Sequence, residues 1–183
     1  MYEEFEIMKK QFAAVLVVFV AALMSFTTVC RAQTPDPAPD VPKPDLSGSW
    51  KLNLDKSNMG RTKAPVALIE TISQSGTSEI TFQVRRITEQ GEVKFHYTLQ
   101  IGGPVTGIPT NTFSPDDDFK IQDAQASWAA DSLIVTYNAT YKKTQMTLVS
   151  HYTLSRDGGR LTRATNIDED AGPDYTVEIF DKD

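Results

Sequence analysis

The chain has 183 residues, of which 40% are apolar and 23% are charged, and its formal net charge at pH 7 is −6. This length and composition predict one globular domain, since two domains of ordinary size would need a longer chain. The acidic balance argues against nucleic acid as a partner, because an acidic surface repels a phosphate backbone.

The first 32 residues are ordered like a secretory signal peptide. Lysines at positions 9 and 10 precede an apolar run over residues 12–24, and small and polar residues follow up to Ala32. This order predicts export, cleavage after Ala32 and a secreted or periplasmic protein. A translation start at Met8 would leave out an acidic stretch that signal peptides lack.

Two alternatives would keep the chain attached to a membrane of the cell envelope. Residues 11–29 would just span a bilayer if this segment stayed uncleaved. Cys30, the single cysteine, would be the lipid acceptor in a bacterial lipoprotein. Cleavage after Ala32 instead leaves a mature chain without cysteine, and therefore without a disulfide, a thiolate nucleophile or a cysteine metal site.

Residues 33–45 contain five of the ten prolines and almost nothing to bury. Such a composition predicts a disordered, extended tether that does not belong to the fold. The tether is either a spacer between a membrane and the domain or a terminus with no role. The folded domain then covers residues 46–183.

Beyond the tether, apolar and polar residues alternate in short runs, which is typical of strands with one buried face. The predicted inward positions are Trp50, Leu52 and Leu54; Ile80, Phe82 and Val84; Val93, Phe95, Tyr97, Leu99 and Ile101; Leu133, Val135, Tyr137, Ala139 and Tyr141; Met146, Leu148, Ser150, Tyr152 and Leu154; and Tyr175, Val177 and Ile179. Turn signals lie at 74–76, 89–91, 157–159 and 172–174. We predict an all-β fold, a single antiparallel up-and-down meander of 8–9 strands that closes into a barrel.

The first strand carries Gly48-Ser49-Trp50, which resembles the G-x-W motif of lipocalins. In that family the tryptophan closes one end of an eight-stranded barrel, and an arginine from a late strand packs across it. The resemblance implies that Gly48 and Trp50 close the barrel here. Either Arg160 or Arg163 would be the arginine, and a guanidinium over an indole is favourable by about 0.5–2 kcal/mol.

Longer stretches are similar to secreted bacterial lipocalin-like proteins. They are SGSWKLNLDKS (47–57), ASWAADSLIV (126–135) and YTLSRDGGRLTR (152–163). This resemblance implies a calycin-type, lipocalin-like β-barrel.

The function depends on what fills that barrel. An eight-stranded barrel is just wide enough to be filled by its own side chains or to hold one small ligand. The residues expected to line a cavity are Phe82, Phe95, Tyr97, Tyr137, Tyr141 and Tyr152. The leading hypothesis is non-catalytic binding of a small hydrophobic or amphipathic molecule inside the barrel. The alternative is a structural or protein-interaction module of the cell envelope with a filled barrel.

No residue set in the sequence indicates catalysis, a metal or a cofactor. His96 and His151, the two histidines, fall on polar strand faces without a third ligand. Residues 166–177 have the spacing of a calcium loop at their start, but lack its glycine at position six and its glutamate at position twelve. We therefore expect a protein that is not an enzyme and has no metal or cofactor.

Overall fold

The computed structural model describes residues 42–108, 119–168 and 172–183. These residues belong to one compact unit, which is described here by itself. The predicted signal peptide, Cys30, most of the predicted tether and the acidic run 116–118 lie outside the described residues. Within the described ranges, no helix is long and apolar enough to cross a membrane.

The described residues form one sheet of ten strands, with a single short helix. In chain order the elements are β1 (Gly48–Leu52), the 3-10 helix η1 (Leu54–Lys56), β2 (Ala67–Ser75), β3 (Glu79–Thr88), β4 (Gly91–Gln100), β5 (Thr106–Gly107), β6 (Phe119–Ala129), β7 (Ser132–Tyr141), β8 (Thr144–Leu154), β9 (Arg160–Asp168) and β10 (Asp174–Lys182). Neighbouring strands run antiparallel in the order β4-β3-β2-β1-β10-β9-β8-β7-β6-β5.

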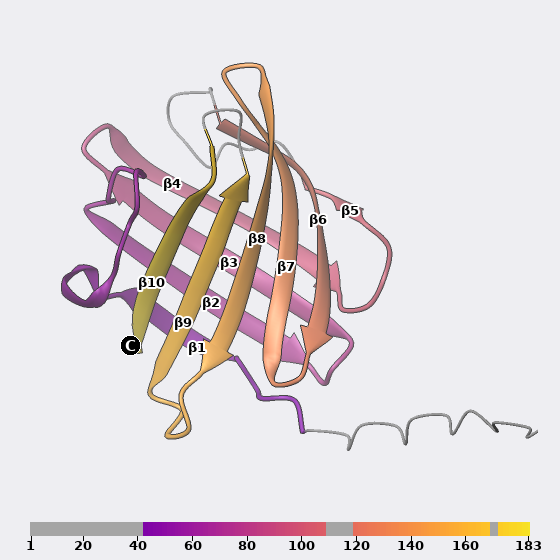
Figure 1. Ribbon diagram of the computed structural model, residues 1–183. Helices are drawn as coiled ribbons and strands as arrows, with labels where there is room; N and C mark the ends of the chain where they lie inside the picture. The colour runs from indigo at the N-terminus through magenta and orange to yellow at the C-terminus, as the bar shows by residue number, and fades with distance from the viewer. Residues whose placement is uncertain (1–41, 109–118, 169–171) are drawn as a thin grey trace, which may run out of the picture. The chain divides into compact units, whose positions relative to one another are not determined.

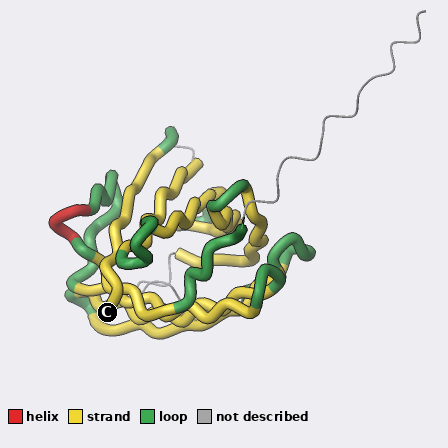
Figure 2. Tube along the Cα trace, turned by 90° about the horizontal axis from the view of Figure 1, so that it is seen from below, coloured by secondary structure: helices red, strands yellow, loops and turns green. Residues whose placement is uncertain are grey.

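The sheet curls until its two ends almost meet. Ile101, just after β4, forms a bridge with Ala126 of β6, and the Gly102 amide donates to the Ala126 carbonyl at 2.7 Å. Strands β6–β10 cross in front of β1–β4 in Figure 1, and the view from below shows strands on both sides of the core, with η1 at the periphery (Figure 2). The predicted all-β, up-and-down barrel is therefore confirmed, with ten strands in the described residues instead of eight or nine.

One end of the barrel is closed by the segment that precedes β1. We call this end the floor, and the opposite end, at the turns 88–91 and 141–144, the far end. Leu46 is fully buried, its carbonyl accepts a hydrogen bond from Trp50 Nε1 at 2.9 Å, and its amide donates to Gln74 Oε1. The chain thus enters the barrel across its floor, and an apolar side chain outside any strand belongs to the core.

Trp50 is 0% exposed, and a lysine lies over its ring. The Nζ of Lys182, the register partner of Trp50 on β10, is 5.3 Å from the ring centroid. Gly48, at φ +150°, leaves room for this stack, since a Cβ there would come within 3.2 Å of Lys182 Cε. The expectation of Arg160 or Arg163 over Trp50 is therefore corrected, because both belong to β9 and the strand beside β1 is β10.

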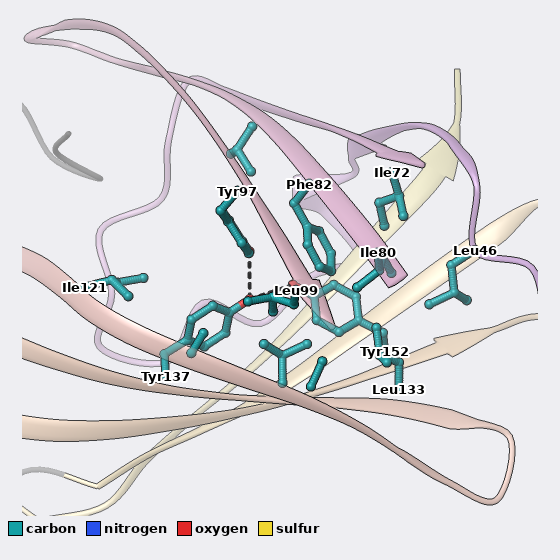
Figure 3. Packing of buried hydrophobic residues seen from close by; sticks show 14 of the residues in the cluster. Leu46, Ile72, Ile80, Phe82, Tyr97, Leu99, Ile121, Leu133, Tyr137 and Tyr152 are labelled. Atoms are coloured by element: carbon teal, nitrogen blue, oxygen red, sulfur yellow. Dashed lines mark hydrogen bonds between the residues drawn. The ribbon is translucent and has the colours of Figure 1, made fainter. Parts of the chain in front are cut away.

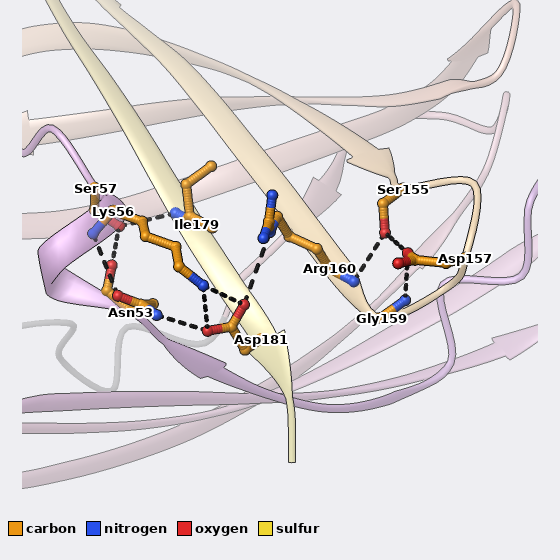
Figure 4. A network of polar contacts seen from close by, with 9 residues as sticks. All are labelled: Asn53, Lys56, Ser57, Ser155, Asp157, Gly159, Arg160, Ile179 and Asp181. Carbon is orange, nitrogen blue, oxygen red and sulfur yellow. Dashed lines mark hydrogen bonds and ion pairs between the residues drawn. The ribbon is translucent and has the colours of Figure 1, made fainter.

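The segment that contains η1 continues beyond β1 along the edge of β10. Asn58 bridges Val177, the Asn53 amide donates to the Ile179 carbonyl at 2.7 Å, and Asp181 accepts from Asn53 and pairs with Lys56. Figure 4 shows this network, which Arg160 joins with its Nε 3.7 Å from Asp181. Arg160 is thus an outer-surface residue.

The predicted inward face of the last strand is corrected by the structure. The sequence predicts Tyr175, Val177 and Ile179 on the inner face of the last strand, whereas the buried, inward residues of β10 are Thr176, Glu178 and Phe180. Val177 and Ile179 lie on the opposite face and are half-buried. Because the inward positions hold the polar Thr176 and Glu178, the apolar residues of this strand mark its outer face. Leu54, predicted to face inward, lies in η1 and is exposed.

Candidate functional site

Four aromatic side chains meet in the middle of the barrel. The Phe82 ring stacks on Tyr97 at a centroid distance of 5.1 Å and lies 5.4 Å from Tyr152. Tyr97 meets Tyr137 edge to face at 6.2 Å. Since Phe82 comes from β3 and Tyr152 from β8, these rings touch across the barrel, as Figure 3 shows. At this level the interior is occupied by the protein's own side chains.

The tyrosine hydroxyls form a chain through this layer. Tyr97 Oη lies 2.8 Å from Tyr137 Oη, which lies 3.4 Å from Tyr152 Oη. Arg163 Nη1 then donates to Tyr152 Oη at 3.5 Å. Burial raises the pKa of all three tyrosines well above the usual value of 10, so the hydroxyls are neutral donors and acceptors.

Arg163 connects this chain to two buried carboxylates. Its Nε and Nη2 donate to the two oxygens of Glu178 at 2.6 and 2.8 Å, the bidentate geometry that suits a guanidinium. Its Nη1 donates to Glu70 Oε1. Glu70 is 1% exposed, and the Arg163 side chain is 18% exposed. Three charged groups from β2, β9 and β10 are therefore held inside the barrel.

The charges in this cluster are set by burial and by each other. Burial raises the pKa of Glu70, and the adjacent Glu178 adds to this, while Arg163 opposes it. Burial disfavours the charged form of Arg163, but Glu178 and Glu70 outweigh this effect and hold its pKa well above the ordinary value. Arg163 is therefore charged, and Glu70 binds a proton more readily than an exposed glutamate.

Three buried side-chain atoms lack partners among the described residues. One is Trp128 Nε1, near the floor end of β6. The other two, Glu70 Oε2 and Arg86 Nε, belong to the inner wall of β2 and β3. Arg86 lies on the inward face of β3, after Ile80, Phe82 and Val84. It is two residues nearer the far end than Val84. Burial lowers the pKa of Arg86, while Glu178 opposes this effect and Arg163 adds to it. Buried polar atoms normally have partners, so these two need an explanation.

The predicted cavity-lining residues do not all come together. Phe82, Tyr97, Tyr137 and Tyr152 share the central layer, and Phe95 stacks on Tyr97 at 6.3 Å but is only half-buried. Tyr141 is 41% exposed, because it ends β7 and extends past the buried part of the wall.

The two histidines also stay apart. His96 lies on the outer face of β4 and His151 on that of β8, and these strands are not neighbours in the sheet. Within the described ranges, no three histidine, cysteine or acidic side chains gather closely enough to hold a metal ion.

The charged part of this site was not predicted from the sequence. Glu70, Arg86 and Glu178 were not predicted as site residues, and Arg163 was assigned only a place over Trp50. A usable signal was present: Glu70 lies between Leu68 and Ile72 at the inward period of its strand. A charge at a position where the alternation demands an apolar residue is expensive to bury and therefore points to a role.

Comparisons with known proteins add little to this geometry. No family model matches the chain, and no curated protein matches it. Among solved structures, the zebrafish ileal bile acid-binding protein, complexed with cholic acid, is similar with a TM-score of 0.45 and 16% sequence identity. The similarity covers 75% of this chain and 98% of that one.

Proposed function

We propose that this protein binds a small apolar or amphipathic molecule inside its barrel and performs no chemical step on it. The observation that supports the proposal is the polar inner wall around Arg163, where Glu70 Oε2 and Arg86 Nε have no partner among the described residues. A barrel that only had to be filled would be at least as stable with hydrocarbon there, because replacing a buried ion pair by packed apolar residues is often neutral or stabilising. A ligand that supplies the missing partners would offset the cost of keeping these groups inside.

The proposal places the molecule between the tyrosine layer and the far end. Below that layer, large apolar side chains fill the space toward the floor, among them the paired Ile80 and Leu99, both at most 1% exposed. Above it the inner wall carries small or polar residues, including Ala139, Thr165 and Thr176. A short ligand with a polar group suits such a wall better than a long hydrocarbon.

The proposed place of action is outside the cytoplasm. It is supported by the order of residues 1–32, a basic start, a short apolar core and a small-residue end. A membrane-anchored form, through an uncleaved segment or a lipidated Cys30, is the alternative for the same binding function.

Two measurements on protein expressed from the full sequence test the binding function. Native mass spectrometry should show a small molecule that co-purifies with the protein. After its removal, the neutral fluorophore N-phenyl-1-naphthylamine should bind with enhanced fluorescence.

A matched pair of variants shows whether the fluorophore lies inside. Ala139 of β7 faces inward, and its neighbour Asn138 faces outward. Ala139→Phe fills interior space and should weaken fluorophore binding at least tenfold, while Asn138→Phe should leave it unchanged; circular dichroism verifies that both variants fold. A chain that carries no small molecule and binds no fluorophore would contradict the proposal.

A further inference from the structure

Glu70 Oε2 and Arg86 Nε, the unpartnered atoms on β2 and β3, specify different ligand groups. Arg86 and Arg85 are adjacent on β3 and show the contrast: Arg85, on the outer face, donates from Nε and Nη2 to Glu92 at 3.1 and 3.0 Å. Arg86 Nε is buried and has no such partner among the described residues. A guanidinium can only donate, and a carboxylate matches its geometry best, so Arg86 calls for an acid group.

Glu70 calls for the opposite kind of group. Its Oε1 accepts from Arg163 Nη1, and the other nitrogens of Arg163 that donate are engaged by Glu178. Glu70 Oε2 therefore has no donor among the described residues, although the side chain is 99% buried. A carboxylate oxygen accepts, so the missing group is a donor. A hydroxyl fits here, whereas an ammonium would be repelled by the guanidinium already bonded to the same carboxylate.

Strand register gives the order of the two groups along the barrel. Glu70 of β2 is paired with Val84 of β3, and Arg86 lies two residues further toward the far end. Two residues of a strand span about 7 Å. Glu70, the hydrogen-bond acceptor, therefore lies deeper in the barrel, and Arg86, the cation, lies nearer the far end.

We propose that the ligand is a compact hydroxy acid, whose hydroxyl donates to Glu70 Oε2 and whose acid group pairs with Arg86 nearer the far end. This inference rests on the proposed binding function and adds the chemical class of the ligand. The apolar part of the molecule lies between the two groups.

Three matched compounds test it: 3-(4-hydroxyphenyl)propionate has both groups, 3-phenylpropionate has only the acid, and 4-propylphenol has only the hydroxyl. Each competes with N-phenyl-1-naphthylamine for the full-chain protein. The compound with both groups should compete best, with about a tenfold loss of affinity on removing either group, the size expected of one hydrogen bond to a charged partner.

Variants then assign each preference to its residue. Arg86→Met should abolish the gain in affinity that the acid group provides and keep the gain that the hydroxyl provides. Glu70→Gln, which keeps the oxygen that faces Arg163, should abolish the advantage of the hydroxyl and keep that of the acid. The outward neighbours provide controls, and Arg85→Met and Glu92→Gln should leave both preferences intact.

The outcomes separate this inference from the binding function. If the fluorophore binds and the three compounds compete equally, or if Arg86→Met and Arg85→Met behave alike, the hydroxy-acid assignment is overturned and interior binding stands. If the fluorophore does not bind the wild-type protein, the binding function fails, and the ligand class fails with it.

Discussion

Arg163 is the residue that holds the charged interior together, because both buried carboxylates depend on it. Replacing it with methionine keeps much of the side-chain volume but leaves Glu70 and Glu178 buried without a cation. We expect Arg163→Met to lower the free energy of unfolding by about 3–5 kcal/mol, the usual cost of breaking a buried ion pair. Arg160→Met, on the same strand but half-exposed, should cost less than about 0.5 kcal/mol.

Urea unfolding followed by tryptophan fluorescence measures both variants. Equal losses of stability for Arg160→Met and Arg163→Met would show that the interior ion pairs stabilise the fold no more than the exposed pair of Arg160 does.

Lys143 occupies a backbone conformation that suits glycine. It lies at φ +75° in the β7–β8 turn, beside Lys142 at φ +46°. A left-handed conformation costs an L-residue roughly 1–2 kcal/mol, and glycine avoids this cost. Part of the resulting gain in stability is lost because glycine makes the unfolded chain more flexible. We expect Lys143→Gly to raise the free energy of unfolding by about 1 kcal/mol, measured in urea. Lys120→Gly in β6 serves as the control and should lower it.

At the scale of strands, the alternation of apolar and polar residues predicts a strand only where most inward side chains are apolar. Strands β4 and β7 were predicted because apolar side chains occupy nearly every inward position. Strands β2, β6 and β9 were not described as alternating runs, since Glu70, Arg163 and the small Ala124 and Ala126 occupy theirs. The residues that make the interior polar or narrow are therefore the ones that hid these strands.

Strand β10 was predicted with its faces exchanged for a different reason. Its inward positions include the polar Thr176 and Glu178, whereas Val177 and Ile179 on the outer face are apolar, so hydropathy alone favours the wrong face. Closure into a barrel was predicted from the need to protect strand edges. The contact of Ile101 with Ala126 was not, because pairing between distant strands depends on three-dimensional register and not on local pattern.

The segment before β1 has no regular structure, yet it contributes to the core. Leu46→Ala should lower the free energy of unfolding by about 2–5 kcal/mol, the range for a fully buried leucine, because it opens a hole beside Trp50. The matched change is Val66→Ala in another segment without regular structure, where the side chain is 62% exposed and the effect should be below about 0.5 kcal/mol. Thermal and urea unfolding of the two variants decide the matter, and a small effect at Leu46 would refute its role in the floor.

At the scale of the whole molecule, stability should depend on pH through Glu70. Its pKa in the folded protein is raised above the ordinary 4.5. The folded state therefore binds the proton more tightly than the unfolded state does, so this contribution is fully present below pH 4.5 and is lost as the pH rises through the folded pKa. We expect the free energy of unfolding of Glu70→Gln to fall less than that of the wild type as the pH rises from 4.5.

Glu92→Gln is the control for this pH series. Hydrogen bonds from Arg85 and Lys94 lower the pKa of Glu92 to about 2, so its contribution is present above pH 4.5 and is lost only in acid. The slope of Glu92→Gln above pH 4.5 should match that of the wild type. A Glu70→Gln slope identical to the wild type would refute the assignment.

The pairing of β1 with β10 determines when the barrel can be completed during synthesis. These strands lie in the middle of the sheet order, and Asn53 and Asp181 meet across 128 residues of chain. Closing so long a loop is entropically costly, and contacts of this separation slow folding. A nascent chain emerging from the ribosome can form the β2–β3–β4 and β6–β7–β8 hairpins early, but it has no ring until β10 has been translated.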